Sequence, residues 1–103
     1  MTDLYVLQSG AAEDLRSIVR YTRDTWGSRQ ARAYSEKLRD GIERLAKGQG
    51  AYKNLSDIHR SLRVARCEHH YIFYLLREDA QIIVIAILHE RMDLISRVSE
   101  RLA

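Results

Sequence analysis

Hydrophobic positions change their spacing along the chain, and the changes divide it into segments. A short apolar run at residues 4–7 is rich in strand-forming side chains and ends at Gln8-Ser9-Gly10, which predicts a first strand. From Ala11 the spacing becomes helical, so an amphipathic helix is expected up to residue 26, capped by Ser9 or Gly10. Its inward face consists of Leu15, Ile18, Val19, Thr22 and Trp26.

A second helical pattern runs from about Arg29 to Lys47. Gly27 can adopt the left-handed conformation that ends the first helix, and Ser28 is expected to cap the second. Two amphipathic helices with so short a link predict an antiparallel hairpin. Gly41 would cost about 1 kcal/mol inside a helix, so we expect it to permit close packing.

The second half of the chain has mainly strand character. Residues 51–60 have no clean period and are expected to form a loop. Three strands are predicted near 62–67, 70–76 and 81–89, and the last is almost wholly apolar, which is typical of a strand buried on both faces. Residues 77–80 supply the link between the last two strands.

The C-terminal residues predict a short amphipathic helix. Asp93 is its expected cap, and Leu94, Ile95, Val98 and Leu102 form its apolar face. The predicted fold class is therefore α+β: an N-terminal strand, a two-helix antiparallel hairpin, a three-stranded antiparallel meander and a short C-terminal helix. A chain of 103 residues is expected to form one domain over residues 1–103.

Composition excludes several classes of protein. With 46% hydrophobic and 30% charged residues, the chain is neither disordered nor membranous. Its longest apolar run, from Ile82 to Leu88, is far shorter than the ~18 residues of a spanning helix. The first residues lack the pattern of a signal peptide, and the single Cys67 cannot form an internal disulfide. We expect a cytoplasmic protein that does not bind a membrane.

The net charge is +3, and the basic surplus lies in the middle of the chain, where residues 28–60 carry 8 basic and 4 acidic side chains. This surplus permits contact with an acidic partner or with nucleic acid. Dedicated duplex-binding proteins usually carry a stronger basic stripe, so no direct sequence-specific nucleic acid binding is expected.

No cofactor or metal is predicted. His69 and His70 are adjacent and would point to opposite faces of a strand, while His59 and His89 are isolated in sequence. Gly48-Gln49-Gly50 lacks the lysine and the hydroxyl residue of a phosphate-binding loop.

Two groups of charged residues allow both a structural and a functional interpretation. Arg63 and Arg66 either deter edge-to-edge strand pairing or bind phosphate or carboxylate groups. The run from His89 to Asp93 follows a buried strand. Its imidazole, carboxylate and guanidinium could run acid–base chemistry on a phosphodiester, or Glu90 and Arg91 could form a local ion pair while Asp93 caps the last helix. From the residues alone, the second interpretation is favoured.

The sequence as a whole resembles the ParE branch of the ParE/RelE superfamily of bacterial toxins. The resemblance lies in residues 12–18, in Tyr21-Thr22-Arg23-Asp24-Thr25-Trp26-Gly27, and in residues 30–34 and 45–46. It continues in His70-Tyr71-Ile72-Phe73-Tyr74 and in the segment from Ile85 to Asp93, which contains Leu88-His89-Glu90-Arg91-Met92-Asp93.

This resemblance implies the toxin of a type II toxin–antitoxin system, of the kind used in plasmid maintenance. Such toxins inhibit DNA gyrase by trapping its cleaved complex with DNA, which blocks replication, and a ParD-like antitoxin neutralises them. The implied protein is not an enzyme. RelE-like relatives are instead ribosome-dependent mRNA endonucleases, and this activity is the alternative. Arg63, Arg66 and Arg91 would then assist cleavage, and His89 would replace the acid–base residue that is missing after Met92.

Two partner sites are expected. An acidic antitoxin segment could bind the basic face of the second helix and an open sheet edge near the following strand, with Arg32, Arg39, Arg63 and Arg66 as contacts. Contact with gyrase is expected at the exposed turn and the last helix. The contact residues would be His89, Glu90, Arg91, Met92 and Asp93.

Overall fold

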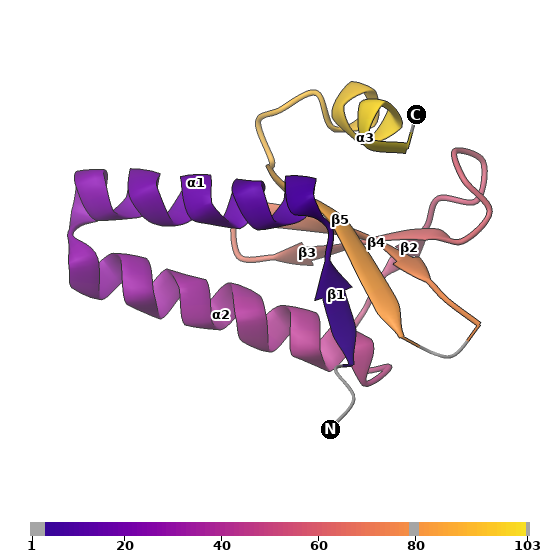
Figure 1. Ribbon diagram of the computed structural model, residues 1–103, viewed down its shortest axis with the longest axis horizontal. Coiled ribbons are helices and arrows are strands. Elements are labelled where there is room, and N and C mark those ends of the chain that lie inside the picture. The colour runs from indigo at the N-terminus through magenta and orange to yellow at the C-terminus, as the bar shows by residue number, and fades with distance from the viewer. Residues whose placement is uncertain (1–3, 79–80, 103) are drawn as a thin grey trace.

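The computed structural model describes residues 4–78 and 81–102. In chain order the elements are β1 (Tyr5–Leu7), α1 (Ser9–Trp26), α2 (Ser28–Ala46), β2 (Lys53–Asn54), β3 (Leu62–Cys67), β4 (His70–Leu76), β5 (Ile82–His89) and α3 (Leu94–Leu102). Three helices and a five-stranded sheet confirm the α+β class, with the strands in the order β1-β5-β4-β3-β2 (Figure 1).

The predicted meander is present as β3, β4 and β5, which pair antiparallel. One feature of the sheet goes beyond the prediction and one differs from it. β1 pairs parallel with β5, so the sheet is mixed. Residues 53 and 54, expected in a loop, form strand β2 against Val64 and Arg63. A pair of exposed polar residues carries no hydrophobic alternation, so only its backbone pairing reveals this strand.

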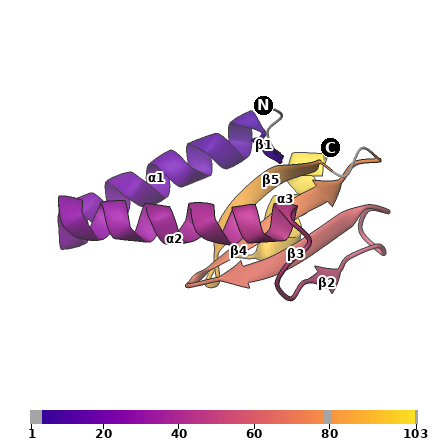
Figure 2. The same ribbon diagram turned by 90° about the horizontal axis from the view of Figure 1, so that it is seen from below.

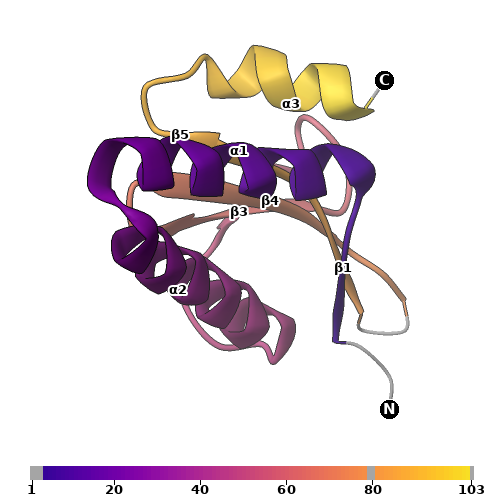
Figure 3. The same ribbon diagram turned by 60° about the vertical axis from the view of Figure 1, so that its left-hand side comes forward.

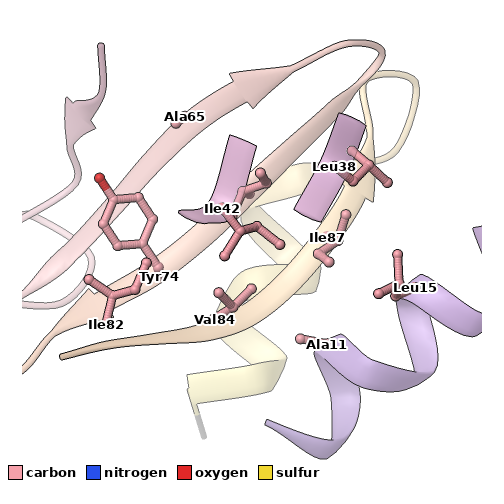
Figure 4. Close-up of a cluster of buried hydrophobic side chains, with 10 residues drawn as sticks. Ala11, Leu15, Leu38, Ile42, Ala65, Tyr74, Ile82, Val84 and Ile87 are labelled. Carbon is pink, nitrogen blue, oxygen red and sulfur yellow. The ribbon is translucent and has the colours of Figure 1, made fainter. Parts of the chain in front are cut away.

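Helices cover both faces of the sheet, unequally. The α1–α2 hairpin lies on one face and α3 on the other (Figure 2). Under the hairpin, Ala11 and Leu15 of α1 and Leu38 and Ile42 of α2 pack on β3, β4 and β5 (Figure 4). Opposite them, a second cluster forms around Val98 of α3. Its buried members are Leu62, Phe73, Ile85, Ala86, Leu88 and Val98.

Strand β5 contributes to both clusters because its side chains alternate between the two faces, and a β-bulge interrupts this alternation once. Phe73 pairs with Ala86 and Tyr74 with Val84, so Ile85 is an extra residue. Ile85 and Ala86 belong to the cluster under α3, while Val84 and Ile87 belong to the cluster under the hairpin. Every residue from Val84 to Leu88 is buried, which confirms the prediction of a strand covered on both faces.

Gly27 and Gly41 have their predicted roles in the hairpin, whereas the residues at the helix starts differ from the prediction. Gly27, with φ of 96°, turns the chain between α1 and α2. A Cβ on Gly41 would lie 2.6 Å from the Sγ atom of Cys67, so the expected close packing is confirmed. Ser28 is not a cap but the first residue of α2, and Gln8 rather than Ser9 or Gly10 precedes α1. Neither helix has a side-chain hydrogen bond that caps its first turn. Helix α1 begins where the chain leaves β1, and α2 begins directly after the turn at Gly27.

Some predicted core positions are exposed. Trp26 is 68% exposed because α1 and α2 extend beyond the sheet, so the far end of their hairpin has nothing to pack on (Figure 1). Ile95 of α3 is exposed for a related reason: a helix of nine residues presents only one side to the sheet. Part of the predicted link at residues 77–80, Asp79 and Ala80, lies outside the described residues. None of the described helices is long and apolar enough to cross a membrane.

Candidate partner-binding surfaces

A groove runs between α1 and α2 and ends at β1. Its apolar lining comes mainly from Leu7, Ala12, Leu15, Val19 and Ala31. Its polar lining is largely basic, with five arginines and one glutamate among the residues that form the walls: Arg16, Arg20, Arg23, Arg32, Arg39 and Glu36. We call this surface the basic groove. An apolar floor between cationic walls is complementary to an amphipathic segment with acidic flanks.

The arginines of the basic groove differ in how they are paired. On α1, Glu13 accepts hydrogen bonds from Arg16 at 2.8 Å and from Arg20 at 3.3 Å, and these bonds lower the pKa of the Glu13 carboxyl. On α2, Arg32 and Arg39 have no carboxylate partner among residues 4–78 and 81–102. Both belong to the predicted antitoxin contacts, so the groove brings together two of the four.

Arg63 lies outside the basic groove. Its guanidinium carbon is 4.2 Å from the centre of the Tyr52 ring, beside the short strand β2. The expected open sheet edge exists only in part, because β2 pairs with β3 at Arg63 and Val64. Along the outer edge of Ala65–Cys67, no described strand is paired.

Arg66 lies on the other face of β3 from Arg63. It is opposite Tyr71, which packs with the α3-side cluster, whereas Arg63 is opposite Tyr74 of the hairpin-side cluster. Arg66 donates to Glu90 at 2.7 Å, and the Glu90 backbone N–H donates to the His69 carbonyl. An expected antitoxin contact is therefore joined to the segment that was expected to contact gyrase.

The segment from His89 to Asp93, which we call the β5–α3 turn, is organised by backbone hydrogen bonds. The Arg91 backbone N–H donates to Nδ1 of His89 at 3.1 Å, and that of Met92 donates to the His89 carbonyl. Asp93 caps α3 as predicted, accepting from the Ser96 hydroxyl at 2.9 Å and from its backbone N–H.

The prediction of an ion pair between Glu90 and Arg91 is wrong. Glu90 binds Arg66 and lies 3.6 Å from His69, because these residues at the β3–β4 turn lie across from it. The Arg91 guanidinium has no hydrogen-bonding partner in the described part of the chain, and Met92 is 46% exposed. The turn thus offers an unpaired cation beside an exposed apolar side chain.

A partly buried polar cluster, which the sequence did not predict, lies between α2 and the start of β4. The Tyr34 hydroxyl is 2.7 Å from Nδ1 of His70 and accepts a hydrogen bond from the His69 backbone N–H. One proton is shared along this contact, and the tautomer of His70 sets whether the hydroxyl or Nδ1 donates it. Burial, with smaller effects of His89 and His69, lowers the pKa of His70 to about 4. His70 is neutral at pH 7.

The polar cluster extends to His89, whose ring packs edge-on against His70 with ring centres 5.2 Å apart. Its Nδ1 is occupied by the Arg91 backbone, so this nitrogen is not free to act as a base. One sequence signal could have revealed the cluster: His70 shares the alternating positions of Ile72 and Tyr74, which are inward-facing.

Comparison with known proteins decides the family. The family model described as ParE toxin of type II toxin-antitoxin system, parDE, matches residues 5–94. The chain belongs to the ParE toxin family. Toxin ParE of Escherichia coli is 53% identical over 98 residues, which cover 95% of each chain. Toxin ParE1 of Mycobacterium tuberculosis is 31% identical over 93 residues, covering 90% of this chain and 95% of that relative.

The fold of this ParE-family toxin agrees with a solved structure. A chain in the structure of the chromosomal ParDE TA system from P. aeruginosa matches with a TM-score of 0.70, covering 82% of this chain and 92% of that one at 17% identity. The resemblance seen in the sequence is thereby confirmed for family and fold. The family model spans the basic groove and the β5–α3 turn but ends at the first residue of α3.

Proposed function

We propose that this ParE-family toxin inhibits DNA gyrase by trapping its cleaved complex with DNA, and that a ParD-like antitoxin neutralises it. The chain does no chemistry of its own in this account, and one domain of residues 1–103 carries both binding surfaces. Both partners imply a cytoplasmic location. The observation that carries the proposal is the extent of the family match, over residues 5–94 and at 53% identity to Toxin ParE of Escherichia coli.

The antitoxin is proposed to bind the basic groove. Arg32 and Arg39 have no carboxylate partner in the described chain, so an incoming carboxylate would not have to displace an existing ion pair. An acidic amphipathic helix would bury its apolar face on Leu15 and Val19 while its flanks meet these guanidiniums. Arg63 is proposed as a secondary contact beside the partly open edge of β3.

Gyrase is proposed to contact the β5–α3 turn and α3. Arg91 and Met92 are exposed side by side there, and an unpaired arginine next to a flexible apolar side chain is a common combination in protein interfaces. Glu90 and Arg66 support the turn from below through their 2.7 Å ion pair. Arg66 is therefore better assigned to the gyrase-binding side than to the antitoxin site.

The alternative, ribosome-dependent mRNA cleavage, requires basic side chains and an acid–base group around one phosphate. Arg63 and Arg66 lie on opposite faces of β3, Arg66 is paired with Glu90, and one nitrogen of His89 accepts the Arg91 N–H. This geometry supports the gyrase proposal over mRNA cleavage.

A reconstituted gyrase assay tests the proposal. Purified protein is added to gyrase and relaxed plasmid, and supercoiling and cleaved DNA are followed on a gel. We expect loss of supercoiling, trapped breaks that appear as linear plasmid after detergent and protease treatment, and relief by the ParD-like antitoxin. Unaffected gyrase, together with codon-specific cleavage of mRNA on added ribosomes, would contradict the proposal and establish the alternative.

A further inference from the structure

An ion pair between two residues that are far apart in sequence joins the last helix to the first. Arg101, near the end of α3, donates to both carboxylate oxygens of Asp14 in α1, at 2.8 and 3.0 Å. The side chains are only 30% and 15% exposed. Figure 3 shows why they meet: the C-terminal end of α3 lies beside the start of α1. A forked, partly buried pair of this kind fixes direction as well as distance.

The same two side chains also complete the edge of β5. Strand β1 pairs with β5 only as far as Leu7 and Val84, and the Gln8 N–H makes the last bond of that ladder. Immediately beyond, Asp14 accepts the Ile87 backbone N–H at 2.9 Å and Arg101 donates to the Ile85 carbonyl at 2.8 Å. The pair thus takes the place of a neighbouring strand at the β-bulge.

Gly10 leaves room for this arrangement. A Cβ at this position would lie 2.8 Å from Nη1 and 3.0 Å from Cζ of Arg101. The guanidinium therefore passes over the first turn of α1 where a side chain would push it away. Three residues thus act together: Gly10 in the first turn of α1, Asp14 one turn later, and Arg101 in the last turn of α3.

The rest of the α3 packing is less directional. Val98 is fully buried, and Leu94 and Leu102 are partly buried. A helix of nine residues does not persist in water without tertiary contacts. Its apolar stripe sets which side faces the sheet, but apolar burial is non-directional and defines the position along the sheet only loosely. The Asp14–Arg101 pair fixes the position of the C-terminal end of α3, and the Asp93 cap fixes its N-terminal end.

We propose that Asp14 and Arg101 are positioning residues for gyrase binding. They hold α3, and with it the preceding β5–α3 turn, in the orientation that gyrase recognises, without contacting gyrase or the antitoxin. This inference rests on the proposed function. It assigns a role to a part of the chain beyond the residues matched by the family model, which end at Leu94.

Arg101→Ala, Arg101→Lys and Gly10→Ala test the inference. Arg101→Ala removes the pair, Arg101→Lys keeps the charge but loses the fork, and Gly10→Ala displaces the guanidinium without removing a charge. Lys47→Ala, which breaks the exposed Lys47–Glu43 ion pair at the end of α2, is the matched control. Each variant is assayed for trapped gyrase complexes, for antitoxin affinity by calorimetry, and for amide hydrogen exchange.

We expect the toxin concentration for half-maximal trapping to rise about tenfold or more for Arg101→Ala, since displacement of a binding element by about 1 Å can have such effects. Arg101→Lys and Gly10→Ala should be intermediate and Lys47→Ala unchanged. Antitoxin affinity should stay within about twofold of wild type. Exchange should become faster only at Ile87 and in α3.

Two results would overturn the inference alone: normal trapping despite faster exchange in α3, or equal loss of trapping and antitoxin affinity with fast exchange throughout. The second result would make the pair a general determinant of folding. A wild-type protein that binds antitoxin but traps no gyrase would instead overturn the proposed function and this inference with it.

Discussion

The two faces of the sheet are covered in different ways. On one, two helices of 18 and 19 residues bury a cluster of ten side chains, and they extend past the sheet so that Trp26 is largely exposed. On the other, a nine-residue helix buries only Val98 fully and depends on its cap and on the Asp14–Arg101 pair. The hairpin is thus held mainly by the large apolar surface that it buries, whereas α3 is held by a few directional contacts.

This difference is consistent with the proposal that the two faces serve different partners. The basic groove lies on the hairpin, which is the more heavily packed of the two helical layers. The β5–α3 turn lies on the lightly packed face, where local opening costs less than global unfolding. Breaking packing should therefore have global consequences on the hairpin face and local consequences on the α3 face.

The largest expected effect is on the hairpin face. Leu38→Ala removes a fully buried side chain between α2 and the sheet and should lower the free energy of unfolding by about 3–4 kcal/mol. Val98→Ala on α3 should cost about 2 kcal/mol and speed hydrogen exchange mainly within α3. Urea denaturation and exchange measurements check both; equal costs with equally global exchange would remove the distinction between the faces.

Acid should weaken the hairpin face through His70. Its pKa is about 4 in the folded protein against 6.5 ordinarily, because the ring is buried among Tyr34, His69 and His89. Between these values the unfolded chain binds a proton that the folded chain does not. Stability is therefore lost as the pH falls from about 6.5 towards 4, by roughly 3 kcal/mol. Urea midpoints across this range should fall more steeply for wild type than for His70→Asn; parallel curves would contradict the assignment.

Gly41→Ala probes the contact between α2 and β3. The new Cβ would lie 2.6 Å from the Cys67 Sγ, so we expect a net loss of about 1 kcal/mol despite the better helix propensity of alanine. In a Cys67→Ala background the clash disappears, and the same substitution should stabilise by up to about 1 kcal/mol. A double-mutant cycle by urea denaturation checks this, and additivity of the two substitutions would contradict it.

The smallest effect is expected at the cap of α3. Asp93→Ala removes two hydrogen bonds to Ser96 and should cost about 1 kcal/mol, expressed as fraying of the first turn of α3. Amide exchange at Ser96 and Arg97 reports it. If exchange is unchanged there, the N-terminal end of α3 is held by packing rather than by its cap.

The sequence predicted what local patterns encode. Helical spacing located α1, α2 and α3 to within a residue or two, the apolar run at residues 82–88 identified the strand buried on both faces, and Gly41 indicated close packing. The parallel pairing of β1 with β5 and the two-residue strand β2 depend on contacts between distant segments, so no local pattern reveals them.

The candidate sites were predictable only in part, for the same reason. Arg32 and Arg39 lie on one helix, and spacing alone put them on one surface. The partner of Glu90 is Arg66 rather than its neighbour Arg91, because the β3–β4 turn lies across from the end of β5. Asp14 and Arg101 are separated by 87 positions, and only the packing of α3 against the sheet brings them together.

The central claim is that the two regions bind different partners, and one gyrase titration tests it directly. We compare wild type, Arg32→Glu/Arg39→Glu in the basic groove, and Arg91→Glu in the β5–α3 turn. The groove variant should trap gyrase like wild type but need about tenfold or more antitoxin for relief, while Arg91→Glu should trap poorly and still bind antitoxin tightly. If each variant instead impaired trapping and antitoxin binding to the same extent, the two surfaces would not be separate, and the account would be wrong.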